Sequence, residues 1–444
     1  GVESYLARIN YGFKSRYYID ASWRTDGSSR FHPSDRWGHF WSVGASWRIS
    51  EEQFMENTRQ WLDNLTLKVS YGVQGNDNLG TYYAWQGLYD YTWPNATDAG
   101  AFVDKLENRK VTWEKNGNLN AGIEATMFGG RLGVSVEYYN RKTRDMLLNS
   151  PLPISTGFTG FNDNVGSLRN QGLEVSLRGT ILDKRDFRWD ATLMGSFNRN
   201  KVLSLTGGQD VITSGIRVIE VGRPIYTFYL PKTAGVDPAT GKQLYYAYWT
   251  QTVNDEGTLV NTRCDEYITD NVAMATLSKY YHESREPKLF GSIGSTFTIL
   301  KNIDVSFLTT YSIGGWVYDG LYNGSMYVQY AGNNWHKNAK RRWQKPGDKT
   351  DVPMLEVGGS YATTSNSLID ASYFAIKNIT VGYTLPKRWL KKIDIESLRI
   401  YATLDNIAMF NHMDGMDPQY NFTGSVAYSY TPSRVIAFGI DLNF

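Results

Sequence analysis

The sequence has few of the features on which small secreted domains, metalloproteins and membrane helices depend. Its 444 residues include one cysteine, Cys264, which excludes a disulfide framework and any site built from several cysteines. No run approaches the roughly 18 consecutive apolar residues of a membrane-spanning helix. Positive and negative side chains are balanced, with 46 Lys and Arg against 44 Asp and Glu. We therefore do not expect the basic face of a nucleic-acid-binding protein.

Candidate metal ligands and catalytic groups are also sparse. The five histidines have no metal-ligand spacing, and none lies beside a nucleophile motif, so neither a metal site nor an enzyme active site is expected. They are His32, His39, His282, His336 and His412. Four loop carboxylates offer the oxygen ligands that calcium takes, but without EF-hand spacing. They are Asp90, Asp104, Asp163 and Asp255. The sequence therefore predicts no cofactor.

Aromatic residues are abundant, at 14% of the chain with 31 Tyr and 14 Trp, and apolar residues recur at every second position. In the last such segment, Ile436, Phe438 and Ile440 alternate with Ala437 and Gly439. This period of two predicts β-strands. About thirteen segments of roughly the ten residues that a barrel strand needs follow one another. They lie at residues 4–13, 17–24, 41–49, 65–74, 118–125, 132–139, 173–181, 189–198, 289–299, 303–311, 373–385, 398–406 and 434–444.

Alternation of this kind fits two architectures. In a soluble β-sandwich the apolar face is the core, whereas in an outer-membrane barrel it meets lipid and the other face lines a polar lumen. The polar face here is mostly Ser, Thr, Gly and Asn, which favours the barrel. Aromatic residues such as Trp23, Trp41 and Trp189 lie toward strand ends, as in the aromatic girdles of barrels.

The connections give the strongest argument for a barrel, because shorter and longer ones alternate strictly. The shorter set lies at residues 14–16, 50–64, 128–130, 182–186, 300–302 and 386–397, and the longer set at 25–39, 76–110, 142–169, 199–287, 312–371 and 407–433. Outer-membrane barrels have short periplasmic turns and long extracellular loops. In the second short connection, Ser50 as N-cap and Gln53 at the capping-box position predict a short periplasmic helix.

The predicted fold class is therefore all-β, a transmembrane antiparallel β-barrel. Residues 1–444 form one portion of it, with no linker to a second domain. Because an odd number of strands cannot close a barrel with both ends periplasmic, we expect the chain to be part of a larger barrel.

Short motifs spread over the whole chain strengthen this interpretation. Tyr-Gly-Val-Gln-Gly-Asn occupies residues 71–76, Asn-Gln-Gly-Leu-Glu residues 170–174 and Gly-Tyr-Thr-Leu-Pro residues 382–386. Further segments of the same pattern lie at 24–31, 47–50, 138–143, 145–148, 164–166, 222–224, 234–238, 377–380 and 398–401, with a terminal Phe444. In their order and spacing these motifs make the chain similar to the SusC family, the TonB-dependent outer-membrane transporters of Bacteroidetes glycan- and peptide-uptake systems.

The resemblance implies a barrel of about 22 strands with an N-terminal plug. This chain would supply the C-terminal thirteen or so, without the plug and the early strands. The resemblance also implies an integral outer-membrane location and active import of oligomeric glycans or peptides. The substrate would be captured between the long loops and a SusD-like lipoprotein lid. Energy from the TonB complex would then displace the plug. The resemblance further implies contact with membrane lipid and lipopolysaccharide.

Aromatic side chains crowd three of the long loops, and such rings stack on sugar faces while Tyr and Trp also donate hydrogen bonds. The residues selected as substrate or partner contacts are Trp85, Tyr89, Asp90, Trp93, Trp249, Tyr330 and Trp335. The alternative is that these rings pack the loops together or bind the partner lipoprotein, because interfaces also favour Tyr and Trp. A basic run suits anionic lipopolysaccharide, an acidic substrate or salt bridges within the protein. Its members are Lys337, Lys340, Arg341, Arg342 and Lys345.

The last strand ends in an aromatic residue, Phe444. A terminal aromatic on an amphipathic strand resembles the signal that the barrel-assembly machinery reads. We therefore expect Phe444 to act in barrel assembly.

Three alternatives to an outer-membrane importer remain open from the sequence alone. A passive porin has the same lipid-facing pattern of apolar residues. A plug-coding region upstream would identify the protein as a transporter and not a porin. A surface adhesin or a barrel enzyme is the second, although no histidine lies convincingly within a strand beside a nucleophile. A soluble β-sandwich is the third, and recovery in the membrane fraction would exclude it.

Overall fold

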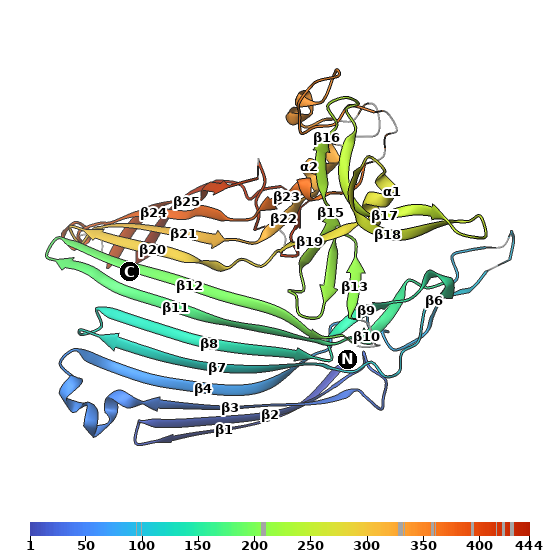
Figure 1. Ribbon diagram of the computed structural model, residues 1–444. Coiled ribbons are helices and arrows are strands. Elements are labelled where there is room, and N and C mark those ends of the chain that lie inside the picture. The colour runs from blue at the N-terminus through green and yellow to red at the C-terminus, as the bar shows by residue number, and fades with distance from the viewer. Residues whose placement is uncertain are drawn as a thin grey trace.

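The computed structural model is a curved antiparallel sheet with a layer of loops over one of its ends (Figure 1). It describes residues 1–444 except 95, 99, 206–209, 327–331, 333, 357–358, 360, 392–394, 414, 420–421 and 427–429, and at 426 the backbone alone. The thirteen strands of the sheet follow one another in chain order. They are β1 (Val2–Phe13), β2 (Tyr17–Ser28), β3 (Trp37–Arg48), β4 (Leu62–Asn76), β7 (Glu114–Met127), β8 (Leu132–Arg144), β11 (Ser167–Lys184), β12 (Phe187–Ser204), β20 (Leu289–Ile299), β21 (Ile303–Ile313), β24 (Tyr373–Thr384), β25 (Ser397–Asn411) and β27 (Val435–Asn443). All thirteen predicted segments correspond to these strands, so the antiparallel all-β prediction is confirmed.

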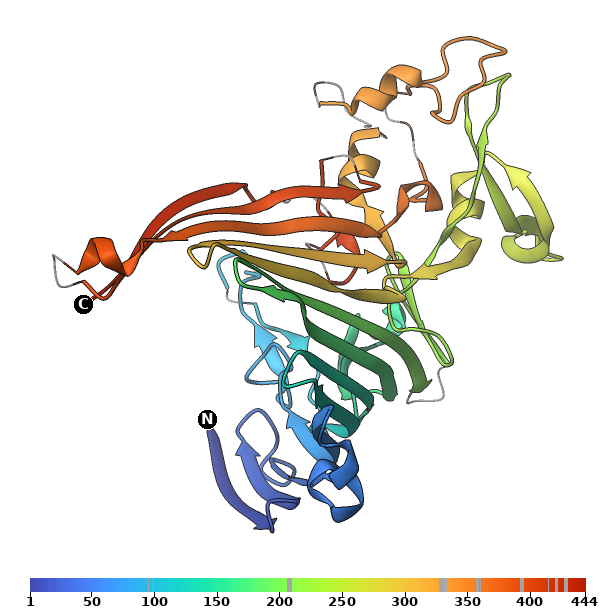
Figure 2. The same ribbon diagram turned by 90° about the vertical axis from the view of Figure 1, so that its left-hand side faces the viewer.

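Every pair of neighbouring strands in the sheet is antiparallel, and the sheet curls into an open trough (Figure 2). The register places apolar residues of neighbouring strands opposite one another. Leu193 lies opposite Ile293, and Trp189 lies opposite Phe297. Because successive side chains of a strand point to opposite faces, this register keeps the apolar residues on one face of the sheet.

The apolar face of the sheet is open to its surroundings. Ile9 is 73% exposed, Phe438 82% and Ile440 67%. In a soluble sandwich these side chains would form the core, and so large an exposed apolar surface marks an interaction site. A bilayer supplies the missing contact, because the lipid face of a barrel is apolar. The exposure therefore excludes the soluble sandwich.

The opposite face of the sheet is polar and carries paired charges. Lys68 lies 2.5 Å from Glu124, and Arg399 contacts Asp304 at 2.6 Å and Asp441 at 3.3 Å. Ion pairs and hydroxyls suit a water-filled lumen, so this face is the interior of the barrel.

The connections alternate between the two ends of the sheet as predicted, but their lengths do not alternate strictly, because residues 29–36 form a shorter connection than residues 49–61 or 385–396. The short connections lie at residues 14–16, 49–61, 128–131, 185–186, 300–302 and 385–396. Two of them are tight, with positive φ angles of 52° and 55° at Lys14 and Ser15 and of 53° and 64° at Leu300 and Lys301. The long connections, here called the loop layer, lie at residues 29–36, 77–113, 145–166, 205–288, 314–372 and 412–434. By the rule for outer-membrane barrels, the loop layer is extracellular.

The loop layer contains regular structure that the sequence periodicity does not reveal. Its strands are β5 (Leu88–Asp90), β6 (Phe102–Lys105), β9 (Leu147–Pro151), β10 (Gly160–Asn164), β13 (Val211–Ser214), β14 (Arg217–Glu220), β15 (Thr227–Pro231), β16 (Thr233–Val236), β17 (Gln243–Val253), β18 (Leu259–Thr269), β19 (Lys279–Ser284), β22 (Trp316–Asp319), β23 (Leu368–Asp370) and β26 (Ser425–Val426). Its helical segments are η3 (Ile154–Thr156), α1 (Val272–Leu277), α2 (Gly320–Met326), η4 (Lys337–Arg341) and η5 (Ser365–Ser367). In the described part of the chain, no helix has the length and apolar character needed to cross a membrane.

The prediction of a helix capped by Ser50 is wrong. The segment forms two 3-10 turns, η1 (Ile49–Glu51) and η2 (Gln53–Thr58), and Ser50 lies inside the first with its hydroxyl buried and unpaired. Glu52 instead fixes the segment, because its carboxylate accepts hydrogen bonds from Tyr17 Oη at 2.5 Å and Trp47 Nε1 at 3.0 Å. These bonds hold the connection against the strand ends, so the chain does not continue as an α-helix.

Two substitutions, each placing a charge on a different face of one strand, test which face meets lipid and which meets the lumen. Val69 is 44% exposed on the apolar face of β4, and Ser70 lies beside a lumen hollow of about 300 Å³ that Asp20 and Glu137 also line. We predict that Val69→Arg lowers the free energy of unfolding in bilayers by about 2–4 kcal/mol, because it buries a charge in hydrocarbon.

The matched control, Ser70→Arg, is expected to change the free energy of unfolding by less than about 1 kcal/mol, since a lumen charge stays in water. Urea titration of the protein folded into phospholipid vesicles measures both values. Equal effects of the two substitutions would contradict the assignment.

Candidate functional site

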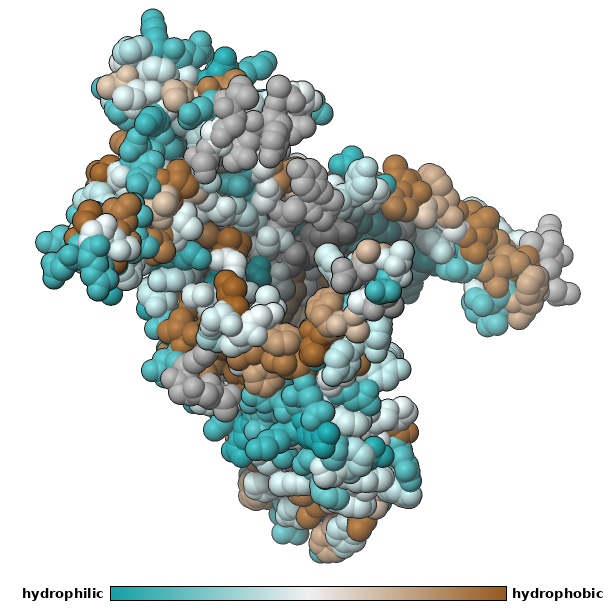
Figure 3. All heavy atoms as spheres, turned by 90° about the vertical axis from the view of Figure 1, so that its right-hand side faces the viewer, coloured by the Kyte–Doolittle hydropathy of each residue, from teal (hydrophilic) through white to brown (hydrophobic). Residues whose placement is uncertain are grey.

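The loop layer is the candidate functional site, and it is held together by its own small cores. Five clusters of buried apolar side chains occur among the described residues, and all five lie at or above the loop-side ends of the strands. Representative members are Phe31, Phe228, Tyr245, Val317 and Met326. Figure 3 faces this layer and shows hydrophobic residues gathered between more hydrophilic areas. The loops are therefore packed structures that can position side chains.

The hairpin of β5 and β6 holds three of the predicted contact residues. Tyr89 is 59% exposed and Trp93 67%, and the Trp93 ring meets Phe102 edge-on at 6.3 Å. Asp90 serves the turn itself, because its carboxylate accepts from the Thr92 hydroxyl at 2.7 Å and the Thr92 N–H at 2.8 Å. These bonds lower the pKa of Asp90. The two rings, rather than the carboxylate, are available to a ligand or partner.

Trp85 belongs to the same loop but has a packing role in the structure. It packs against the cluster of Phe31, Phe40, Val111 and Trp113, and its ring meets His32 edge-on at 5.1 Å.

The other predicted contact residues lie in separate parts of the loop layer. Trp249 is half-buried in β17. Its backbone N–H donates to Ser278 Oγ at 3.2 Å, and its backbone C=O accepts from Tyr267 Oη at 2.9 Å. Trp335 is 37% exposed and lies with Ala339 at a small hollow. Tyr330 lies outside the described residues. Across the described residues, no ring contact joins Trp85, Trp249 and Trp335 into one site.

The charged groups of the loop layer are largely engaged within it. In the basic run, Arg341 pairs with Asp351 at 3.1 Å, and Asp163 accepts from Asn108 Nδ2 at 3.1 Å. No group of three His, Cys, Asp or Glu side chains that could hold a metal ion occurs among the residues that the structure describes. Phe444 directly follows β27 and is 85% exposed.

A cluster of tyrosine rings and cations is the feature that sequence reasoning missed in part. Tyr229 and Tyr281 are paired across β15 and β19 with their ring centroids 4.9 Å apart, and Tyr248 meets Tyr280 edge-on at 5.3 Å. Tyr248 belongs to a sequence-local group of aromatic residues, but pairing of distant strands brings the other three to it. No local signal in the sequence predicts this pairing.

Three cations complete this group, here called the tyrosine–cation cluster. Arg223 lies 3.7 Å from the centre of the Tyr281 ring, and Arg263 lies 5.2 Å from that of Tyr248. Lys232 lies 4.4 Å from the Tyr246 ring and 5.8 Å from the Tyr280 ring. Contacts of this kind are attractive because a cation meets the negative face of the ring.

The hydroxyl groups of Tyr248, Tyr280 and Tyr281 stay protonated at neutral pH. Burial raises the pKa of Tyr248, and burial together with a hydrogen bond to Glu266, 2.8 Å from Tyr280 Oη, raises the pKa of Tyr280. Tyr281 is 42% exposed, and burial with Glu220 beside it raises its pKa as well. Arg223 is paired with Glu220 at 2.7 Å, so the cluster offers ring faces and the positive charges of Lys232 and Arg263, which suit a polar oligomer or a protein partner.

An apolar face toward lipid, a polar lumen and an extracellular loop layer define an outer-membrane β-barrel. The family model described as TonB dependent receptor-like, beta-barrel matches residues 3–407 of the chain. The chain belongs to this family, and its sheet is the wall of an integral outer-membrane barrel.

Known relatives agree with this assignment over the whole chain. TonB-dependent receptor P26 of Formosa agariphila is 29% identical over 476 aligned residues, covering 100% of this chain and 46% of that protein. TonB-dependent receptor SusC of Bacteroides thetaiotaomicron is 29% identical over 457 residues, covering 99% and 43%. The chain thus spans about half the length of the curated relatives it matches. These relatives are receptors, so the comparisons place the chain with transport proteins and not with enzymes.

Solved structures give the same result. The RagAB peptide transporter superposes with a TM-score of 0.84 at 29% identity, covering 100% of this chain and 48% of that chain. The RagAB peptide importer in its open-open state superposes with a TM-score of 0.80 at 28% identity, covering 100% and 47%.

Substitution of Tyr248 tests how the tyrosine–cation cluster is held. Its hydroxyl donates to the backbone C=O of Lys279 at 2.6 Å. We predict that Tyr248→Phe lowers the free energy of local opening around β17 and β19 by about 1 kcal/mol through loss of this bond. Tyr248→Ala, which also removes the ring packing, should lower it by about 3 kcal/mol.

Hydrogen exchange of the backbone amides in β17 and β19 measures this opening. The control is Tyr89→Phe, whose hydroxyl is on an exposed ring and whose loss should change the opening by less than about 0.5 kcal/mol. Unaltered exchange in Tyr248→Ala would show that the ring does not hold the two strands together.

Proposed function

We propose that the chain forms part of an active importer of oligomeric nutrients across the outer membrane. The superposition of the entire chain on the RagAB peptide transporter, with a TM-score of 0.84, carries the proposal. The polar lumen face supports it, because hydroxyl and amide groups bind a hydrated oligomer weakly and repeatedly. The packed loop layer supports it too, since a simple pore has no need for so many cores above the barrel.

The proposed substrate is a peptide, with a glycan as the second candidate. The two RagAB structures are of a peptide importer, which favours a peptide, whereas SusC is equally similar to this chain at 29% identity. In the tyrosine–cation cluster, Lys232 and Arg263 carry positive charge beside tyrosine ring faces. Such a surface suits peptide carboxylates and carbonyl groups, and its rings suit sugar faces.

The proposed partners are a SusD-like surface lipoprotein above the loop layer and the TonB complex. Interfaces favour exposed aromatic residues, and Tyr89, Trp93 and Tyr281 are among those that the loop layer presents. Trp85 and Trp249 would act indirectly, by holding the loops that carry these rings. Phe444 is retained as a proposed assembly signal.

Dependence on TonB separates the importer from a porin. We predict that uptake of labelled oligopeptides by cells with the full-length protein falls to the background of a transporter deletion when TonB is removed. A porin would pass the peptides without energy, so unchanged uptake in the TonB-deficient strain would reject active import. Parallel assays with labelled oligosaccharides decide between the two substrate classes.

Removal of one exposed ring tests the partner contact. Because a central aromatic at an interface contributes more than about 1.4 kcal/mol, Trp93→Ala should weaken binding of the co-expressed lipoprotein about tenfold. The control is Trp389→Ala on α3 (Lys387–Leu390) at the short-turn end, where the side chain is 54% exposed.

Co-purification of the lipoprotein with each variant, at equal amounts of assembled barrel, measures the difference. Equal loss of binding in both variants, or no loss in Trp93→Ala, would remove Trp93 from the interface.

A further inference from the structure

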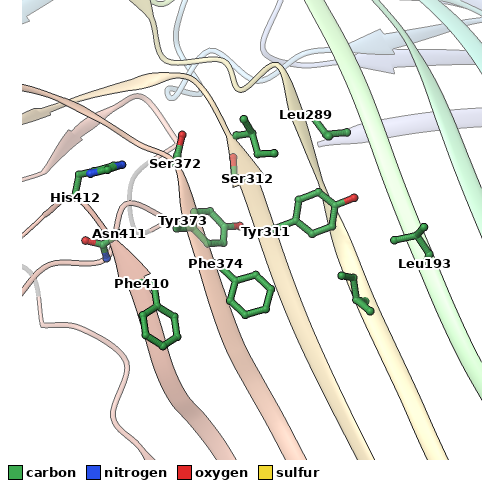
Figure 4. A pocket seen from close by; sticks show the side chains of 12 residues that line it. Leu193, Leu289, Tyr311, Ser312, Ser372, Tyr373, Phe374, Phe410, Asn411 and His412 are labelled. Atoms are coloured by element: carbon green, nitrogen blue, oxygen red, sulfur yellow. The ribbon is translucent and has the colours of Figure 1, made fainter.

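An apolar groove with a volume of about 690 Å³ lies at the loop-side end of five neighbouring strands, β12, β20, β21, β24 and β25 (Figure 4). Leu193, Ile293, Tyr311, Phe374 and Phe410 form its apolar wall. None of these side chains belongs to the loop-layer contacts described above, so the groove is separate from that site.

The groove opens toward the bilayer and not toward the lumen. The register pairs Leu193 with Ile293, and Phe374 with both Tyr311 and Phe410. These residues lie on the face whose side chains are apolar and exposed, with Leu193 at 44% and Phe410 at 61%. The groove is thus continuous with the lipid-facing surface, and hydrocarbon chains are its immediate surroundings.

Two glycines beside the groove make room for the Tyr311 ring that lines it. Gly195 lies opposite Gly291 on the lipid-facing side of β12 and β20, so neither position carries a side chain. The Tyr311 hydroxyl reaches across them and donates to the backbone C=O of Met194 at 2.9 Å. A ring held in this way lines the hollow instead of projecting into lipid.

The upper rim of the groove is polar. Ser372 and His412 lie above the rings of Tyr311, Phe374 and Phe410 in Figure 4, and Asn411 lies above Phe410. Aromatic rings of barrels lie at the membrane interface, so this rim is at the height of the lipid head groups of the outer leaflet.

The rim also carries charge. Lys288 and His412 are exposed, and both lie close enough to Asp370 to interact with its carboxylate. That carboxylate accepts a hydrogen bond from the Ser372 N–H at 2.7 Å. Lys288 thus adds a basic side chain at the level where an anionic head group would lie.

We propose that this groove binds an acyl chain of a phosphorylated glycolipid of the outer leaflet, with a phosphate of its head group at Lys288. The groove faces hydrocarbon, its wall is apolar and its rim is polar, and an acyl chain with an anionic head group matches these three properties. The inference rests on the membrane orientation of the sheet and does not depend on the proposed import activity.

Filling the groove tests the proposal. A Cβ added at Gly195 would lie 3.4 Å from Tyr311 Oη and 3.7 Å from Leu289 Cδ1, which are ordinary contacts, so Gly195→Leu fits the backbone and places a larger side chain against two residues that line the groove. The matched control is Ala191→Leu, which enlarges a residue of the same strand and face four positions nearer the short-turn end.

The measurement is native mass spectrometry of the full-length protein, extracted in mild detergent and titrated with lipid A. We expect a bound lipid A on the wild type and on Ala191→Leu. Gly195→Leu should bind about tenfold more weakly, the equivalent of losing contact with about two methylene groups. Lys288→Ala should lower the affinity for lipid A but leave that for phosphatidylethanolamine unchanged. Heat-modifiable mobility confirms that each variant is folded.

Equal binding of lipid A by Gly195→Leu and Ala191→Leu, or absence of bound lipid A from the wild type, would overturn the proposal. Equal affinities of the wild type for lipid A and phosphatidylethanolamine would overturn the assignment of a phosphorylated glycolipid.

Discussion

The hydrogen-bonding requirement of a backbone in hydrocarbon is the constraint on which the rest of this structure depends. Because lipid offers no partner for N–H and C=O groups, each spanning segment must pair with its neighbours along its whole length. The thirteen strands meet this requirement through antiparallel ladders such as that of β11 and β12, which joins residues 167–184 to residues 187–204. The fixed register in turn sends alternate side chains to lipid and lumen, so one requirement defines both faces of the wall.

A barrel wall with lipid on one side and water on the other has no buried core of its own. Buried apolar side chains are therefore found in the loops. The buried apolar clusters, among them those around Phe31, Phe228 and Val317, lie above the sheet. They give the loop layer enough order to hold the tyrosine–cation cluster, whose Tyr229 and Tyr281 come from strands about fifty residues apart. The loops of this molecule are therefore folded as small units, each with its own core.

The sequence predicts the wall well and the loop layer poorly, for physical reasons. A period of two follows directly from one lipid face and one polar face, so all thirteen strands could be predicted, together with the end of the sheet that carries the longest loops. Short loop strands such as β15 and β19 do not lie between lipid and lumen, so their sequences show no period of two. Their pairing depends on contacts between distant parts of the chain. Ser50 shows the same limit, because bonds from Tyr17 and Trp47 to Glu52 override the local capping signal. Trp85 looked like an exposed ring and instead packs on a core.

The central claim, that one face of the sheet meets lipid and the other meets water, has a direct test. Single cysteines are introduced along β12 in a Cys264→Ser background, at Leu193 and Phe197 on one face and at Thr192 and Ser196 on the other. The account predicts that, in native membranes, a lipid-soluble photoprobe labels the first pair and a membrane-impermeant maleimide added to opened vesicles labels the second. Labelling of all four positions by the maleimide, with none by the photoprobe, would contradict it.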